Sequence, residues 1–217
     1  MGLIKTGIAG LDEFLGGGLL PRVYVLLGSP GSENDLFARQ VAYNRTTLGG
    51  ISYFLCSKTP ESIRDDMLCY KLDVASKEEN GVWRFIKLDK EKNLTDIFSR
   101  ETKQQRSIVL DSLSDILLTT PDMEKIRELL NLLSSRSREK NELYLLLLTE
   151  GMHDQKVEVS IEHFADGVIR FTTIWSGENS IRTLNFKKLN GATVPSRSLV
   201  YSIGSRGFII ETTTRIT

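Results

Sequence analysis

The chain has 217 residues, which suits one domain with a full core, and we expect residues 1–217 to form that domain. Its 28 Lys and Arg residues balance 28 Asp and Glu residues, so overall charge does not indicate nucleic acid or membrane as a partner. The longest apolar run, Leu143–Leu148, is too short to cross a bilayer, and the opening residues lack a continuous apolar signal segment.

The two cysteines, Cys56 and Cys69, form neither a C-x-x-C pair nor a zinc-binding pattern. One lies in an apolar run and the other in a helix-like stretch, so we expect buried free thiols. Together with the missing signal segment, this indicates a reducing, cytoplasmic location.

Glycine-rich turns open the chain. The glycines of the segments Lys5–Asp12 and Gly16–Gly18 mark turns around a short predicted helix, Leu11–Leu15. An apolar strand, Val23–Leu27, follows and leads into the octet Gly28–Asp35.

A helix is predicted directly after the octet, over Leu36–Leu48, and Gly49-Gly50 ends it. Strand, glycine-containing turn and helix form the setting of a phosphate-binding loop, whose pattern is G-x-x-x-x-G-K-[ST]. The octet keeps the first glycine, Gly28, and an internal Gly31. Its last three positions are Glu33-Asn34-Asp35, where the pattern has Gly, Lys and Ser or Thr.

These replacements change the chemistry of the loop. The motif lysine contacts the β- and γ-phosphates, and the hydroxyl binds Mg²⁺. Asn34 is uncharged, while Glu33 and Asp35 are negative like the phosphates. Two like charges about 4 Å apart repel by roughly 4 kcal/mol at an effective dielectric constant of 20. We therefore expect a vestigial nucleotide site that binds no nucleotide productively, made of Gly28, Ser29, Gly31, Ser32, Glu33, Asn34, Asp35 and the later Asp111.

A purely structural interpretation is compatible with this one. Helix N-termini favour Asn, Asp and acidic residues, which cap free N–H groups and oppose the helix dipole. Asn34 or Asp35 would then cap the helix that begins near Leu36, and the protein's own carboxylates would fill the anion site.

The middle of the chain alternates strands and helices. The patterns predict a strand, a helix, a polar turn, a strand and a helix, over Ile51–Cys56, Pro60–Tyr70, Ser76–Asn80, Val82–Leu88 and Leu94–Lys103.

A further buried strand, Ile108–Asp111, ends in a carboxylate. Thr120-Pro121-Asp122 is typical of a helix start, and apolar residues at helical spacing continue to about Lys140. The next strand is Leu143–Leu148. Apolar strands that alternate with amphipathic helices predict a parallel sheet covered on both faces.

The C-terminal part changes character, because strands follow one another there without a long helix between them. They are predicted over Gly167–Ile174, Ser180–Lys188, Leu199–Ile203 and Gly207–Ile210. The predicted fold class is α/β, with a doubly wound, mostly parallel sheet and an antiparallel C-terminal extension.

In these features the chain resembles the KaiC-like branch of the RecA-type ATPases along nearly its whole length. The opening Thr6–Asp12 is similar to that family's signature, and Ile108–Leu113 to its Walker B strand. Leu146–Glu150, Ala165–Ile169 and Thr183–Lys188 are similar to its later core strands. The resemblance implies a RecA-like fold and a ring-type assembly.

The resemblance also implies where reacting groups are missing. Active members carry a Glu-Glu pair after the second strand, and one of these positions the attacking water. Ser57 and Lys58 occupy those positions here. Active members also use a Lys-x-Arg pair toward the neighbouring subunit's phosphates, and here Lys188 is retained while Asn190 replaces the arginine.

Asp111 is retained and has two interpretations. As a functional residue it would assist a bound Mg²⁺. As a structural residue it is a strand-end carboxylate bonded to nearby hydroxyl or N–H groups, which we favour because the loop hydroxyl is missing. Lys58 is placed by topology to pair with Glu33 or Asp35.

We therefore expect a non-catalytic RecA/KaiC-like domain, a pseudo-ATPase that acts as a binding or regulatory subunit and has no catalytic or metal-binding residues. No cofactor is expected, and ATP with Mg²⁺ would bind weakly. The expected partner is a protein or further copies of the chain in a ring, with no membrane. The alternatives are a KaiC-like ATP-binding protein with very weak or absent hydrolysis, and a nucleic-acid-binding paralogue, which the neutral net charge disfavours.

Overall fold

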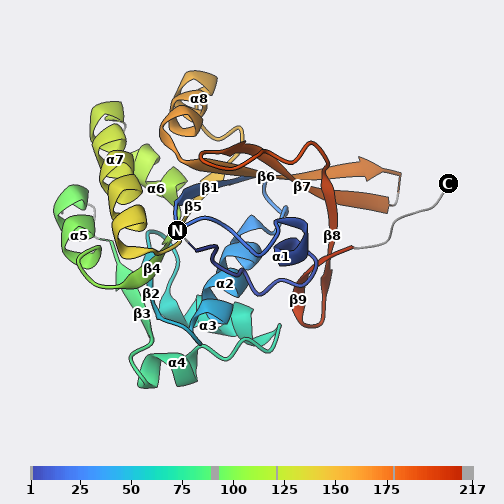
Figure 1. Cartoon of the computed structure of the whole chain (residues 1–217), viewed down its shortest axis with the longest axis horizontal. Coiled ribbons are helices and arrows are strands. Elements are labelled where there is room, and N and C mark those ends of the chain that lie inside the picture. The colour runs from blue at the N-terminus through green and yellow to red at the C-terminus, as the bar shows by residue number, and fades with distance from the viewer. Residues whose placement is uncertain (1, 89–92, 121, 178, 212–217) are drawn as a thin grey trace.

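The computed structural model describes residues 2–88, 93–120, 122–177 and 179–211 (Figure 1). In this part of the chain the strands form one nine-stranded sheet in the order β3-β2-β4-β5-β1-β6-β7-β8-β9. The strands from β3 to β6 in this order are parallel, and β6 to β9 are antiparallel. The predicted fold class is thereby confirmed.

The strands are β1 Val23–Gly28, β2 Gly50–Leu55, β3 Trp83–Lys87, β4 Arg106–Asp111, β5 Tyr144–Thr149, β6 Gly167–Ser176, β7 Asn179–Leu189, β8 Leu199–Gly204 and β9 Gly207–Ile210. The helices are α1 Leu11–Phe14, α2 Asn34–Arg45, α3 Pro60–Leu68, α4 Ala75–Glu79, α5 Leu94–Glu101, α6 Leu113–Thr119, α7 Met123–Lys140 and α8 Gln155–Phe164.

Helices cover both faces of the sheet (Figure 1), and a hydrophobic core lies on each face. The first core packs the sheet against α1, α2 and α3 through Leu11, Phe37 and Ile63. The second packs it against α5 to α8 and includes Phe98 and Leu130. Because both faces are covered, β1, β4 and most of β5 are buried along their length, as the apolar runs within these strands predict.

The register of the central strands brings their carboxyl ends to one edge of the sheet. Gly28 at the end of β1 lies opposite Thr149 at the end of β5, and Leu55 lies opposite Asp111. Ligand sites of open α/β sheets lie outside this edge. The loops that follow β1, β2, β4 and β5 meet there.

Two helices differ from the sequence-based expectation. Ala75–Glu79 forms the short helix α4, where the polar residues Ser76–Asn80 predicted a turn. None of the helix residues is buried, so the sequence has no apolar period here that would indicate a helix. Leu113–Thr119 forms α6, which was not predicted because its apolar residues continue those of the preceding strand. Ser112 caps α6, and its hydroxyl accepts a hydrogen bond from the Asp115 N–H.

The start of α7 also differs. Its N-cap is Asp122, whose carboxylate accepts hydrogen bonds from the N–H groups of Glu124 and Lys125, whereas Thr120 ends α6. Pro121 lies outside the described residues. The acidic side chain accepts more free N–H groups than a threonine at the same place would.

The prediction of buried thiols is wrong for Cys69, which is exposed at the C-terminal end of α3. Cys56 is half-buried, and its thiol donates to the Ser112 carbonyl at 3.3 Å. Burial raises the pKa of Cys56 to about 12, so this thiol stays protonated. No helix in the described residues is both long enough and apolar enough to cross a membrane.

Candidate functional site

The loop after β1 contains two residues whose backbone has a positive φ angle. Gly31 has φ +80°, and Glu33, at the position of the motif's second glycine, has φ +58° in the left-handed region. Side chains adopt that region at a cost of roughly 1–2 kcal/mol. Gly28 has no room for a side chain, because a Cβ there would lie 2.3 Å from Ser32 Oγ. The loop therefore takes a left-handed backbone conformation at Glu33 although Glu replaces the motif's Gly.

Asn34, at the position of the motif lysine, is turned toward its own chain. Its Nδ2 donates a 2.9 Å hydrogen bond to the Leu26 carbonyl of β1. Helix α2 begins at Asn34, earlier than the predicted Leu36, and its N-cap Glu33 makes no side-chain capping bond. Capping by Asn34 was therefore a wrong expectation, whereas Asp35, in the first turn of the helix, accepts the free N–H of Leu36 at 2.9 Å through its Oδ1.

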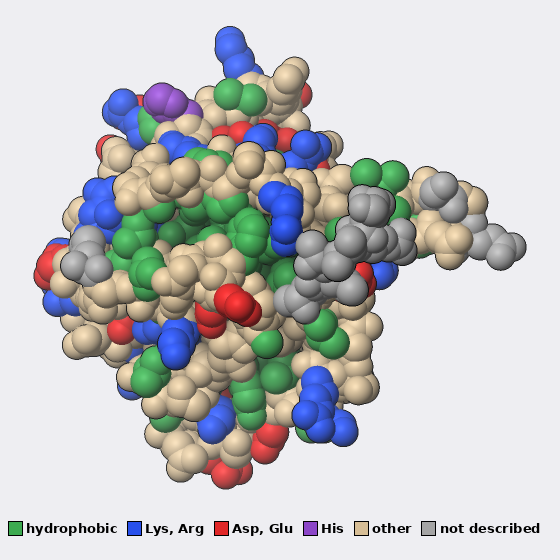
Figure 2. Space-filling view, turned by 45° about the vertical axis from the view of Figure 1, so that its right-hand side comes forward, with side chains coloured by type: hydrophobic (Ala, Val, Ile, Leu, Met, Phe, Trp, Pro, Cys, Tyr) green, Lys and Arg blue, Asp and Glu red, His purple; other side chains and the backbone are tan. Residues whose placement is uncertain are grey.

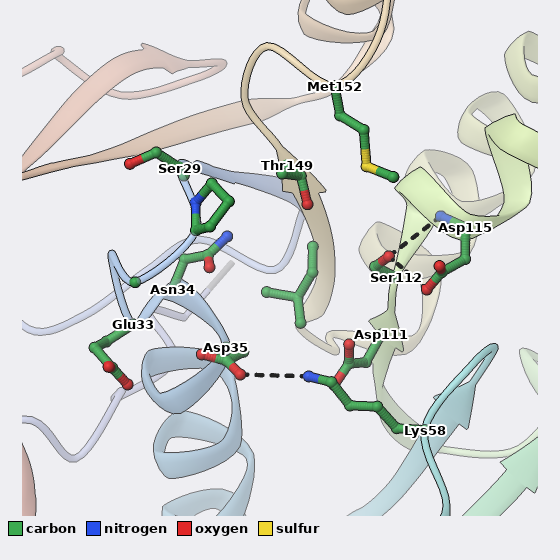
Figure 3. Close-up of a pocket in the computed structure, with 14 residues that line it drawn as sticks. Ser29, Glu33, Asn34, Asp35, Lys58, Asp111, Ser112, Asp115, Thr149 and Met152 are labelled. Carbon is green, nitrogen blue, oxygen red and sulfur yellow. Dashed lines mark hydrogen bonds and ion pairs between the residues drawn. The ribbon is translucent and has the colours of Figure 1, made fainter.

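Asp35, at the position of the motif hydroxyl, forms ion pairs with two cationic side chains. Its Oδ2 lies 3.0 Å from Arg39 Nη2, one helical turn later, and 3.4 Å from Lys58 Nζ (Figure 3). Burial alone would raise the pKa of Asp35, but the Arg39 and Lys58 charges outweigh it and hold the pKa below its usual value. The predicted pairing of Lys58 with Asp35 is confirmed.

Asp111 ends β4 at the other side of the same cavity. Its Oδ2 accepts from the Tyr53 hydroxyl at 2.8 Å, Lys58 Nζ at 3.3 Å and Arg39 Nη2 at 3.5 Å. It is 4% exposed, so these donors replace the water that a carboxylate needs. The structural interpretation of Asp111, a strand-end carboxylate bonded to nearby donors, agrees with these contacts.

Arg39 contacts the carboxylates of both Asp35 and Asp111, and Tyr53 contacts that of Asp111. Arg39 and Tyr53 are functional candidates that the sequence reasoning missed. Arg39 is 4% exposed and also pairs with Asp66 at 3.2 Å. Its Nε donates to the Tyr53 hydroxyl at 3.2 Å. One signal was available in the sequence, because Asp35 and Arg39 stand at the i, i+4 spacing of a helical ion pair.

The loop after β1, Lys58 and Asp111 border a cavity of about 390 Å³ at the carboxyl edge of the sheet (Figure 3). Among the residues that the structure describes, its charged lining consists of four carboxylates, Glu33, Asp35, Asp111 and Asp115, and one cation, Lys58. Burial and the neighbouring Asp35 raise the pKa of Glu33. The other residues that border the cavity are Gly28, Ser29, Pro30, Gly31, Asn34, Ser112, Leu147, Thr149 and Met152.

Of the predicted site residues, Ser32 is the one that does not border this cavity. It is fully buried, and its carbonyl accepts from the Tyr201 hydroxyl of β8, which ties the loop to the antiparallel strands. Asp115 accepts from the hydroxyls of Ser57, at 3.1 Å, and Ser112, at 2.9 Å. Within the described ranges, no group of three or more His, Cys, Asp or Glu side chains is arranged to hold a metal ion.

Lys188, the retained lysine of the Lys-x-Arg position, does not border this cavity and contacts helix α8. Lys188 Nζ donates to the Glu162 and His163 carbonyls near the end of α8, at 3.2 and 2.6 Å. These carbonyls are among the last four of the helix, which have no partner within it. Lys188 therefore has a structural contact within its own chain.

The chain matches, over residues 3–216, the model of a family of unknown function, DUF7125. It belongs to the DUF7125 family. This member is 25% identical to a UPF0273 protein of Thermotoga maritima in an alignment of 233 positions, which covers 95% of each chain. It is 27% identical to the UPF0273 protein PH0284 of Pyrococcus horikoshii, over 95% of this chain and 93% of that one.

The fold of the DUF7125 chain is also that of a solved structure, the KaiC-like protein PH0186 of Pyrococcus horikoshii. The two superpose with a TM-score of 0.81, over 97% of this chain and 99% of that chain, at 21% sequence identity. The resemblance to KaiC-like proteins predicted from the sequence is thereby confirmed at the level of the fold.

Proposed function

We propose that this chain is a non-catalytic KaiC-like domain, a pseudo-ATPase that acts as a binding or regulatory subunit. One observation carries the proposal. Lys58, the cation that borders the cavity, bridges Asp35 at 3.4 Å and Asp111 at 3.3 Å. In a working site such a cation would face phosphate, whereas this one neutralises carboxylates of its own chain.

The side chains present do not fit a magnesium-bound triphosphate. The described residues that border the cavity include more carboxylates than cations, an arrangement that disfavours a polyanion. At the motif positions, the Asn34 amide is bonded to Leu26 and the Asp35 carboxylate is held by Arg39 and Lys58. A triphosphate would have to separate these pairs and leave buried charges uncompensated, which is strongly unfavourable.

Titration calorimetry of the full chain with ATP and with ADP, each with Mg²⁺, tests the proposal. We expect no binding heat up to millimolar nucleotide. The triple variant Glu33→Gly, Asn34→Lys, Asp35→Ser restores the motif and is expected to gain measurable affinity. Micromolar binding by the wild-type chain, or magnesium-dependent hydrolysis of ATP above a blank, would overturn the proposal.

One observation favours a second candidate, a protein that binds nucleotide without turnover. The loop keeps its left-handed residue at Glu33, and a cavity of about 390 Å³ remains beside it. The same calorimetry separates the two candidates, because tight binding without hydrolysis supports the second alone. The variant Lys58→Met sharpens the distinction, since removal of a phosphate-binding cation would weaken such binding.

A further inference from the structure

Within the described ranges, the distal half of β6 has an edge with no neighbouring strand. Strand β1 pairs with β6 as far as Phe171, which lies opposite Gly28, and β1 then turns into the loop. Strand β7 continues to pair on the other side, out to Ser176 opposite Asn179. Among the described residues, the segment 172–176 makes no backbone hydrogen bond outside its pairing with β7. One side of this segment therefore presents unpaired N–H and C=O groups.

The same segment is exposed and apolar. Ile174 is 57% exposed and lies opposite Ile181, which is 51% exposed, so the two share one face of the β6–β7 hairpin. Trp175 is 71% exposed and points to the other face, because successive strand residues alternate. Figure 1 shows the hairpin reaching out from the body of the molecule, and Figure 2 shows hydrophobic side chains near the base of this projection.

The two outer edges of the sheet, in contrast, are protected. At β9 the Gln40 side chain contacts both backbone groups of Phe208: its Nε2 donates to the carbonyl at 3.2 Å, and its Oε1 accepts from the N–H at 2.7 Å. At the other edge, β3 carries the exposed charges of Arg84 and Lys87. Natural sheets protect their edges by covering them or by placing charges on them. The sequence Thr172–Ser176 has neither device and is rich in residues that favour strands.

We propose that Thr172–Ser176 pairs antiparallel with the same segment of a second copy of this chain, about a two-fold axis. With the axis at Ile174, antiparallel pairing sets the two Ile174 side chains opposite each other and each Trp175 opposite Thr173 of the second copy, and such apolar and aromatic–β-branched cross-strand pairs stabilise a sheet. No charged residue lies in the segment, so no like charges meet. Arg182 is on β7, one strand away from the axis.

The size of the edge sets the expected strength. A standard interface buries about 800 Å² on each partner, more than one short strand supplies. We therefore expect a weak dimer whose population rises with protein concentration. A two-fold interface uses the same surface on both copies and closes at two, unlike the head-to-tail contacts of a ring. Pairing at this edge does not depend on the nucleotide cavity.

Sedimentation velocity of the full chain, from micromolar to near-millimolar concentration, tests this inference. The wild-type chain is expected to shift from monomer to dimer. Ile174→Lys and Trp175→Glu, on opposite faces of the hairpin, are each expected to remain monomeric. The matched control Val159→Lys changes a 55% exposed residue of α8 and is expected to dimerise like the wild type. Circular dichroism verifies that each variant is folded.

Three outcomes would overturn the inference: a wild-type monomer over the whole range, dimerisation of both hairpin variants, or an assembly larger than a dimer. Amide hydrogen exchange supplies an independent measurement. The amides that face outward in 172–176 are expected to exchange more slowly at high protein concentration than at low concentration. If the slowing maps to another surface, the dimer forms elsewhere and the proposed pairing is wrong.

Discussion

The Tyr53 hydroxyl donates a 2.8 Å hydrogen bond to Asp111 Oδ2 in a fully buried position. The same hydroxyl accepts from Arg39 Nε at 3.2 Å, so one phenol joins a buried cation to a buried anion. Burial, and then the Asp111 charge, raise the pKa of Tyr53 well above its usual value, and the hydroxyl keeps its proton. This contact connects β2, β4 and α2 under the cavity.

Replacement of this hydroxyl tests the connection. Tyr53→Phe leaves both charged partners without one hydrogen bond, and we expect the free energy of unfolding to fall by about 2 kcal/mol. Urea unfolding followed by circular dichroism measures the change. The matched control is Tyr43→Phe on α2, whose ring lies 5.8 Å from Lys77 Nζ, a contact that phenylalanine retains. We expect the control to be close to neutral.

The backbone at Glu33 gives a second prediction. Because φ is +58° there, Glu33→Gly relieves a conformation that side chains disfavour. Glu33→Ala removes the charge but keeps the unfavourable conformation. We expect the glycine variant to be more stable than the alanine variant by about 1 kcal/mol, measured by thermal unfolding. Equal stability of the two variants would show that the loop relaxes at this residue.

The charge of Glu33 gives a prediction about pH. Burial and Asp35 raise its pKa in the folded chain, so the folded state disfavours the ionised carboxylate at neutral pH. Glu33→Gln is therefore expected to have a higher melting temperature than the wild type at pH 7. The advantage shrinks as pH falls through the raised pKa, and it is lost below the ordinary value of about 4.3. A difference that does not change with pH would contradict this account.

Asp35 is expected to behave in the opposite sense. Its pKa is lowered in the folded chain, so its ionised form stabilises the fold above its ordinary pKa of about 3.9. Asp35→Asn loses the ion pairs with Arg39 and Lys58 and is expected to cost about 2 kcal/mol at pH 7. As pH falls through the lowered pKa, the wild type loses this contribution and the two proteins converge. Urea unfolding at pH 7 and in acid checks both statements.

The contact of Gln40 with β9 is tested by truncation. Gln40→Ala leaves the N–H and carbonyl of Phe208 without these partners, and we expect a loss of about 2 kcal/mol. Hydrogen exchange should then be faster at Phe208. Gln155→Ala, at the exposed start of α8, is the control and is expected to change stability little. A stable variant with unchanged exchange would show that Gln40 does not hold this edge.

Much of the fold is predictable from the sequence, because local patterns determine it. The strand Val23–Leu27 and the strand Leu143–Leu148 are continuous apolar runs, and both form buried strands of the sheet. The glycines of the loop mark the turn after β1. Helix α4 and helix α6 escape prediction, because neither Ala75–Glu79 nor Leu113–Thr119 shows a helical apolar period that stands out from its surroundings.

The candidate site is less predictable, because it is made of contacts between distant elements. The residue types at Asn34 and Asp35 exclude the motif chemistry, but they do not reveal that Asn34 bonds to Leu26. Arg39 resembles an ordinary helix residue until the fold brings Asp111 to its guanidinium. The pairing of Lys58 with Glu33 or Asp35 was predicted beforehand, because the carboxyl ends of parallel strands share one edge, and the structure shows the pair with Asp35.

One of the two tryptophans is buried and the other is exposed, so their fluorescence reports on two different parts of the chain. Trp83 is buried and stacks on Tyr53 with ring centroids 5.5 Å apart, whereas Trp175 is 71% exposed on the hairpin. A soluble quencher will reach the indole of Trp175 in the native state and that of Trp83 only after unfolding. With Trp175→Phe, the remaining emission follows the core alone, so comparison of this variant with the wild type separates loss of the core from events at the hairpin.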